Sequence, residues 1–367
     1  MARKLKFDRL LFITTLALIA VSIVMVYSAS NLMAAQESVR PNAYLAKQAL
    51  FAAMGLVAMF IAMRIDYERY RDPRLVVGLL AFTLVALAAV LLIGPRINGT
   101  RRWFAVAGVG IQPSELAKLA IILFTAAVLE RRMERISEPG YAVGPIVVAV
   151  VPVLGLMMLQ PDFGSSLVLL AIVAVMVFAA GLPWRYVVKA GAVIVPVVAV
   201  VAILDRYRIR RLTAFLDPWA DRQDSGYQLV QSLIAVGSGG VTGNGLGYGV
   251  QKLGYLPYPH TDFIYAVVGE ELGLVGATVL LACFCVITWR GLKTASRAPD
   301  AFGSLVALGL TAMIGVQAFV NMSVVLGLLP TKGITLPFVS AGGSSLIVSL
   351  VGMGVLLNIS QRASATT

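Results

Sequence analysis

The long polar segment that precedes the apolar run starting at Phe263 ends in a carboxylate, Asp262. A carboxylate at the mouth of a membrane helix is partly desolvated, which raises its pKa toward that of a useful general base. Asp262 is therefore the first candidate for catalysis. The structural alternative is a helix N-cap, for which Thr261 and Asp262 are well suited. His260, the single histidine, could also act as a base, but a lone loop histidine more often makes a polar contact.

Two other carboxylates stand at the ends of apolar runs. Glu115 and Lys118 are three residues apart at the start of one run, so they share a helix face and can form an ion pair. Asp162 lies in a very short turn between two runs. Each has a structural alternative, which is a local ion pair beside a helix cap for Glu115 and capping of the helix that begins near Ser165 for Asp162.

These residues must be positioned by helices in a bilayer. Of 367 residues, 59% are hydrophobic and 13% charged, which is far from the balance of a soluble domain. Because roughly 20 apolar residues cross the hydrocarbon core as a helix, the sequence predicts an all-α polytopic membrane protein with about ten spans and no separate soluble domain. The predicted spans are Leu10–Tyr27, Ala43–Met63, Leu75–Ile93, Leu116–Leu129, Pro145–Leu159, Ser165–Ala180, Tyr186–Ile203, Phe263–Trp289, Phe302–Leu328 and Ser345–Ile359.

The distribution of basic residues predicts the orientation. The loops on the side of the two termini are all short and basic, so the N- and C-termini are predicted to be cytoplasmic. Basic residues on the outer side oppose this rule, and most lie in 96–118 and in the large loop 204–262. They suggest an anionic ligand such as a lipid diphosphate, with contact to outer-leaflet headgroups as the alternative. A net charge of +12 could also indicate nucleic-acid binding. The predicted location in a membrane argues against that partner.

The large loop contains two further features. Residues 226–235 have helical spacing and half-apolar composition, which predicts a helix along the membrane interface. The glycine-rich segment 237–249 follows, and its composition predicts a flexible connector rather than a phosphate-binding loop. Glu270 and Glu271 lie two turns into the next span, where acidic side chains should face protein rather than lipid.

Several motifs resemble those of one family, the SEDS proteins FtsW, RodA and SpoVE. Residues 327–345, GLLPTKGITLPFVSAGGSS, resemble the family signature, and QPSE at 112–115, QPD at 160–162, YQLVQS at 227–232 and HTDF at 260–263 follow the family in order. The residues PTKG at 330–333 and YRIRR at 207–211 are more similar to the FtsW branch of the family than to the RodA branch. Ala341 is a departure, since the family usually has tyrosine before the paired glycines.

The resemblance implies a peptidoglycan glycosyltransferase that polymerises lipid II with a class B penicillin-binding protein transpeptidase as its partner. Asp262 then matches the essential aspartate and would act as general base. Glu115, Lys118 and Asp162 match polar residues of an outward-facing cavity. The further substrate-binding candidates are the outward cations Arg101, Arg102, Arg208, Arg210 and Arg211, together with Lys332 and Ser344 of the signature segment. A divalent cation, Mg²⁺ or Mn²⁺, is an additional candidate for neutralising the diphosphate.

Two rival functions remain at this point. A transporter of lipid-linked precursors would place charged sites near the membrane midplane in paired broken helices, whereas the charges here gather at the outer ends of the spans. A scaffold that recruits division proteins would not need Asp262. The cysteines, Cys283 and Cys285, lie within an apolar run and are predicted to be inert packing residues.

Overall fold

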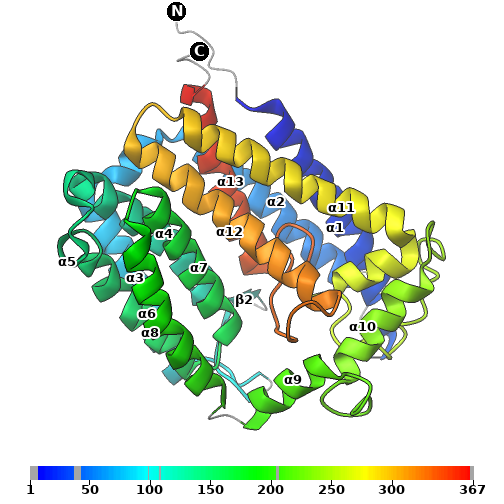
Figure 1. The fold of residues 1–367 in the computed structure, drawn as a ribbon. Helices are drawn as coiled ribbons and strands as arrows, with labels where there is room; N and C mark the ends of the chain where they lie inside the picture. Colours follow the sequence, from blue (N-terminus) through cyan, green and yellow to red (C-terminus); the bar gives the residue numbers. More distant parts are fainter. Residues whose placement is uncertain (1–6, 37–42, 98, 107–108, 204–205, 364–367) are drawn as a thin grey trace, which may run out of the picture.

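The computed structural model describes residues 7–36, 43–97, 99–106, 109–203 and 206–363, and it shows a helix at each of the ten predicted spans (Figure 1). These helices are α1 (Arg9–Gln36), α2 (Ala43–Arg64), α3 (Pro73–Ile93), α4 (Pro113–Arg132), α6 (Gly144–Leu159), α7 (Phe163–Ala179), α8 (Trp184–Ile203), α11 (Ile264–Arg297), α12 (Ala301–Val325) and α13 (Gly343–Ala363). Short helical turns η1 (Tyr67–Arg71), η2 (Met133–Arg135) and α5 (Pro139–Ala142) connect some of them.

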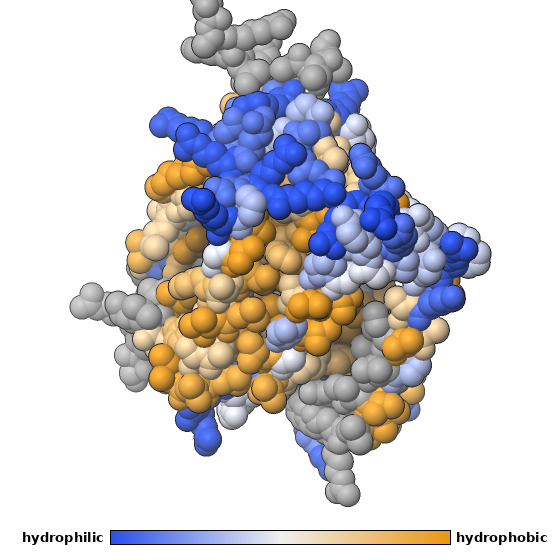
Figure 2. Space-filling view, turned by 90° about the vertical axis from the view of Figure 1, so that its left-hand side faces the viewer, coloured by the Kyte–Doolittle hydropathy of each residue, from blue (hydrophilic) through white to orange (hydrophobic). Residues whose placement is uncertain are grey.

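Six of these helices, within the described residues, are long and apolar enough to cross a membrane. Two shorter apolar helices are α6 and α7. α4 is less apolar, because it carries Glu115 and Lys118 near its start and Arg131 and Arg132 at its end. The helical positions are thus as predicted, and the number of spans stays a prediction. Figure 2 shows a broad hydrophobic band on one face, bounded by hydrophilic residues at the end where α13 terminates.

The helices pack around α12, which contacts both α11 and α7, while α13 packs along α2 (Figure 1). Their buried faces form one continuous apolar core. At one end of the bundle the backbone N–H of Asp8 donates to Ser360 Oγ at 3.1 Å, and Arg290 Nε donates to Asp8 Oδ2 at 2.6 Å. The start of α1 and the end of α13 therefore lie together, as an even number of spans requires.

A buried asparagine secures that end. Asn358 of α13 accepts a hydrogen bond from the Tyr67 backbone N–H at 3.0 Å and donates to Met63 O at 2.9 Å. One side chain thus fixes the chain reversal after α2. The asparagine is 8% exposed, so its bonds are shielded from water.

The structure adds one small element that the predicted helices do not include. Between α3 and α4 the chain forms a small antiparallel hairpin of β1 (Phe104–Val106) and β2 (Val109–Ile111), with Phe104 opposite Ile111. Three-residue strands are too short to give an alternating pattern that stands out from an irregular loop. The hairpin is fastened to α13, because Ser344 Oγ donates to Gly110 O at 2.8 Å.

The large loop 204–262 begins with α9 (Arg206–Leu216) and continues into α10 (Tyr227–Ser238), which confirms the helix predicted at 226–235. The interpretation of the glycine-rich segment as a flexible connector is wrong. It packs against α11 at a break in that helix, where Gly273 has φ 65° and ψ −164°. Gly243 approaches so closely that a β-carbon there would stand 2.2 Å from Glu271 O. Glycine here permits contact between backbones rather than motion.

The break in α11 is filled by hydrogen bonds from the loop. The N–H groups of Asn244 and Gly245 donate to the carbonyls of Glu270 and Glu271, each at 3.0 Å. In return, the N–H groups after Gly273 find acceptors in the loop, with Leu274 N 2.9 Å from Gly240 O and Val275 N 3.1 Å from Val241 O. A helix broken inside a membrane protein needs such partners for its freed backbone groups.

Candidate active site

Asp262 lies two residues before α11, and its carboxyl group does not cap that helix. The N-cap residue is Phe263, and no side chain makes a capping bond there. The N-cap alternative for Asp262 is therefore wrong. The side chain is partly buried and accepts no hydrogen bond from any described residue. It faces residues 327–342, which lie between α12 and α13 and are called the signature loop below, since a β-carbon on Gly333 would lie 2.9 Å from Asp262 Oδ2.

The surroundings of Asp262 raise its pKa toward neutrality. Burial raises the pKa of Asp262 from its usual 3.8 to about 6, although the positive charges of Arg211 and Arg102 act to lower it. Asp162 contributes a smaller upward shift. A carboxyl group with a pKa near neutrality is mostly ionised at pH 7 and is also a stronger base than an ordinary aspartate.

Cations from different segments converge on this carboxyl. Arg102, in the loop before β1, donates from Nε to Gln160 O and from Nη2 to Pro161 O, both at 2.7 Å. Arg211 of α9 donates from Nη1 to Thr331 O at 3.2 Å. Both guanidinium groups are held by backbone carbonyls of the turns that surround Asp262, so their positions are fixed before any substrate binds.

Lys332 and Asp162 complete the set of charged side chains at the site. The ammonium of Lys332 lies 4.2 Å from the centre of the Phe163 ring, a cation–π contact beside the N-terminus of α7. Asp162 caps that helix, with Oδ1 accepting from Ser165 N at 3.3 Å. Its Oδ2 also accepts from Ser114 Oγ at 3.0 Å. The capping alternative for Asp162 is thus confirmed, and the same carboxylate also belongs to the surroundings of Asp262.

The predicted Glu115–Lys118 pair forms and is deeply buried. The two side chains are 2.9 Å apart, and Lys118 is 2% exposed. Lys118 Nζ also donates to Gln317 Oε1 of α12 at 2.7 Å. Ser344 contacts the hairpin, donating to Gly110 O and accepting from Gln112 N at 3.1 Å. Its hydroxyl is therefore already engaged within the protein.

Other predicted candidates lie elsewhere. Arg101 donates to the last carbonyls of α3, Leu91 O at 3.2 Å and Leu92 O, where a cation complements the helix dipole. Arg210 is exposed and pairs with Asp224 at 3.5 Å. The side chain of Arg208 lies outside the described residues. The structure thus separates Arg101 and Arg210 from the group of Asp262, Arg102 and Arg211.

The backbone on both sides of the site is strained. Tyr258 and Phe338 have φ of 55° and 62°, a region that side-chain-bearing residues rarely adopt. Each costs on the order of 1–3 kcal/mol, and such residues persist where surrounding contacts hold them. Here the segments that contain them are joined, because Ala341 N donates to His260 O at 2.9 Å and Ser340 Oγ donates to Thr261 O at 2.6 Å.

The sequence predictions did not include two amides of α12, Gln317 and Asn321, which donate to backbone carbonyls of the site. The available signal was their spacing of four residues within an otherwise apolar span, where polar side chains are costly and usually functional.

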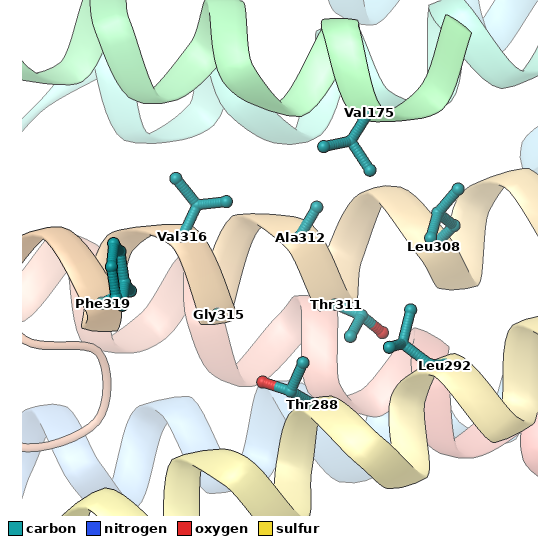
Figure 3. A pocket seen from close by; sticks show the side chains of 9 residues that line it. All are labelled: Val175, Thr288, Leu292, Leu308, Thr311, Ala312, Gly315, Val316 and Phe319. Atoms are coloured by element: carbon teal, nitrogen blue, oxygen red, sulfur yellow. The ribbon is translucent and has the colours of Figure 1, made fainter. Parts of the chain in front are cut away.

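An apolar groove of about 310 Å³ lies away from this chemistry, among α7, α11 and α12 (Figure 3). It is lined by Val175, Thr288, Leu292, Leu308, Thr311, Ala312, Gly315, Val316 and Phe319. None of these side chains can carry charge or transfer a proton at neutral pH. The groove is therefore not the reaction centre.

The fold and site define a class of protein: a polytopic helical membrane protein in which the Asp262 carboxyl group accepts no hydrogen bond from the described residues and lies near the fixed cations Arg102 and Arg211. This site is at the end of the bundle opposite the start of α1 and the end of α13. The chain belongs to the FtsW/RodA/SpoVE family of cell cycle proteins, whose model matches residues 8–365.

Full-length relatives have similar sequences. The chain is 42% identical over 356 residues to the probable peptidoglycan glycosyltransferase FtsW of Geobacter sp. (strain M18), covering 97% of both chains. It is also 42% identical over 354 residues to the stage V sporulation protein E of Bacillus subtilis (strain 168), covering 96% of this chain and 97% of that protein.

Solved structures share the fold. A chain from a structure described as "Structural coordination of polymerization and crosslinking by a peptidoglycan synthase complex" aligns with a TM-score of 0.81 and 33% identity, over 98% of this chain and 99% of that one. The rod shape determining protein RodA of Thermus thermophilus aligns with a TM-score of 0.72 and 32% identity, over 98% of both chains. The predicted family and the multi-pass helical membrane fold are confirmed.

Proposed function

We propose that this protein is a peptidoglycan glycosyltransferase that polymerises lipid II into glycan strands. The observation that carries the proposal is the Asp262 carboxyl group, which accepts no hydrogen bond from the described residues and faces fixed cations. Family membership and the names of the full-length relatives support the same activity. The rival flippase and scaffold functions do not require a base of raised pKa at this position.

Asp262 acts as general base in the proposed reaction. It removes the proton from the 4-hydroxyl of the lipid II GlcNAc, and that oxygen forms a bond to the anomeric carbon of the MurNAc at the end of the growing chain. The bond from this carbon to the diphosphate oxygen breaks, and undecaprenyl diphosphate leaves with the electron pair. Direct displacement inverts the anomeric carbon and needs one base, with no covalent intermediate.

The cations stabilise the leaving diphosphate. Arg102 uses Nε and Nη2 to hold the 160–161 turn, and its Nη1 makes no hydrogen bond with the described residues, so this edge can meet a phosphate oxygen. Arg211, which is held by Thr331 O, and Lys332, the next residue in the chain, add further positive charge. Fixed charges of this kind stabilise developing negative charge without having to reorganise.

The sequence also offered a divalent cation, Mg²⁺ or Mn²⁺, as a candidate for neutralising the diphosphate. Across the described part of the chain, no three His, Cys, Asp or Glu side chains are grouped as metal ligands. The residues around Asp262 are mainly cationic, so they do not fit a resident metal ion. Charge neutralisation is assigned to Arg102, Arg211 and Lys332.

We further propose that the Asp262 end faces outward from a bacterial cytoplasmic membrane. The opposite end holds the start of α1, the end of α13 and the basic end of α11, which the positive-inside rule places in the cytoplasm. The related synthase complex couples polymerisation with crosslinking, which supports a class B penicillin-binding protein transpeptidase as partner. The FtsW-named relatives favour division over elongation, so depletion should make cells filament rather than round up.

The decisive experiment is Asp262→Asn in proteoliposomes supplied with lipid II. The amide keeps the shape of the carboxyl but cannot take the proton, so polymer formation should fall by about 10²–10⁴-fold. The wild-type rate should rise with pH through about 6 and then level off. Polymer formation by the Asn variant at the wild-type rate would overturn the proposal, whether or not the variant also flips lipid II.

A further inference from the structure

One side chain of α12 joins the Asp262 turn to the signature loop. Asn321 Nδ2 donates to Asp262 O at 2.8 Å and to Ile334 O at 2.6 Å. Asn321 is 2% exposed, so water cannot replace either bond. The backbone of the proposed base is therefore fixed by a residue that has no place in the reaction itself.

Gln317, one turn earlier on the same face of α12, holds the next residue of that loop. Its Nε2 donates to Thr335 O at 3.0 Å and to Thr335 Oγ1 at 3.2 Å. Its Oε1 accepts from Lys118 Nζ, which is paired with Glu115. Two amides thus hold the successive carbonyls of Ile334 and Thr335.

The chemistry of the partners fixes the orientation of both amides. A lysine ammonium only donates, so Gln317 must turn its oxygen toward Lys118 and its NH₂ toward Thr335. Two backbone carbonyls only accept, so Asn321 must present its NH₂ to them. The buried Glu115–Lys118 pair thereby sets a continuous series of contacts through Gln317, the 334–335 backbone and Asn321 that ends at Asp262.

We infer that Gln317 and Asn321 are positioning residues for glycosyl transfer, which hold the Asp262 carboxyl group in register with Arg102 and Arg211. The inference rests on the proposed function of Asp262. The signature loop carries Gly333, which faces Asp262 Oδ2, and Thr331, whose carbonyl holds Arg211. Releasing this loop therefore moves the base relative to the cations.

The test measures lipid II polymerisation by Asn321→Ala as a function of substrate concentration. A misplacement of about 1 Å costs about 10²-fold in rate, so kcat should fall by that factor. KM should stay within about twofold, because Arg102 is held by the separate 160–161 turn and can still bind the diphosphate. A KM increase without a kcat loss would overturn the inference.

The matched control is Asn358→Ala. Asn358 also bridges two backbone groups while buried, but at the opposite end of the bundle. It should lower the unfolding midpoint as Asn321→Ala does, with kcat per folded molecule within about twofold of wild type. Equal kcat losses in the two variants would indicate a general structural effect and overturn the inference.

A second variant covers the case in which Asn321→Ala does not fold. Gln317→Glu keeps an acceptor for Lys118 but cannot donate to Thr335, so kcat should fall by about tenfold with KM unchanged. Unchanged kcat would overturn the inference. Asp262→Asn is assayed in parallel, because its full activity would reject the proposed function. An inactive Asp262→Asn beside fully active Gln317→Glu and Asn321→Ala would reject only the positioning role.

Discussion

Asp262 and Glu271 are carboxylates nine residues apart, and their surroundings are opposite. Glu271 is fully buried and saturated with donors: Ser28 Oγ lies 2.7 and 2.8 Å from its two oxygens, Gly247 N donates at 3.1 Å, and Lys252 forms an ion pair with it. Asp262 accepts no hydrogen bond from the described residues. A carboxylate whose lone pairs are all engaged stabilises a fold, whereas one without donors is available to take a proton.

The largest effect that tests this difference is on folding. Glu271→Gln leaves the buried Lys252 charge without a counter-ion, which should cost about 3–5 kcal/mol of unfolding free energy. Denaturant unfolding in detergent measures it. Activity per folded molecule should remain, and the double variant with Lys252→Met should recover most of the stability. A stable but inactive Glu271→Gln protein would reverse the roles given to the two carboxylates.

The next largest effect is on the pH dependence of the unfolding free energy. The pKa of Asp262 is raised from 3.8 to about 6 by folding, so the folded protein binds this proton more tightly. The resulting stabilisation is complete below about pH 4 and is lost as the pH rises through about 6. After a discount for partial exposure, the loss is about 2 kcal/mol. Relative to Asp262→Asn, wild type should become less stable between pH 4 and 7, and a constant difference would contradict this.

A smaller effect is expected from crowding Asp262. Gly333→Ala would place a β-carbon 2.9 Å from Asp262 Oδ2, so the carboxyl must shift, and kcat should fall by about tenfold. Gly342→Ala, in the same loop, meets only ordinary contacts at 3.6 Å with Ser345 and Thr335 and serves as control. The polymerisation rates of the two variants test whether crowding of Asp262 lowers kcat, and equal rates would show that Asp262 tolerates displacement.

The smallest effect separates neighbouring arginines of α9. Arg210 is exposed and its pair with Asp224 is weak, so Arg210→Ala should change the rate by less than about twofold. Arg211→Ala should lower it by about fivefold, because Arg102 and Lys332 still supply charge. Initial rates at saturating lipid II provide the comparison. A greater loss from Arg210 would mean that α9 reorients when substrate binds.

The sequence predicted which segments are helical better than it predicted where each helix ends. α1 continues to Gln36 and α11 to Arg297, beyond the predicted ends at Tyr27 and Trp289. Apolarity marks the part of a helix inside the bilayer, and the helical backbone continues after the first polar side chains. The hairpin of β1 and β2 has no comparable signal because its strands are three residues long.

The site was predictable by residue type but not by geometry. Asp262 and Asp162 were identified from their positions at span ends, yet nothing local shows that Arg102 holds the 160–161 turn or that Arg211 reaches Thr331. These contacts join segments about 60 and 120 residues apart through loops without periodicity. The glycine-rich segment was misinterpreted because glycine permits both motion and close contact, and only the fold shows which one applies.

The break at Gly273 also sets a rule for loop length. Residues 240–245 are bonded to α11 on both sides of the break, so an insertion or deletion there would shift donors away from acceptors that have no substitute. Side chains at the tip, such as exposed Leu246 and Tyr248, are under no such restriction. Residues 240–245 should therefore tolerate neither a change of length nor a side chain at Gly243, whereas Leu246 and Tyr248 can change in residue type. A fluorescent protein or epitope inserted into 240–245 would disturb the break in α11.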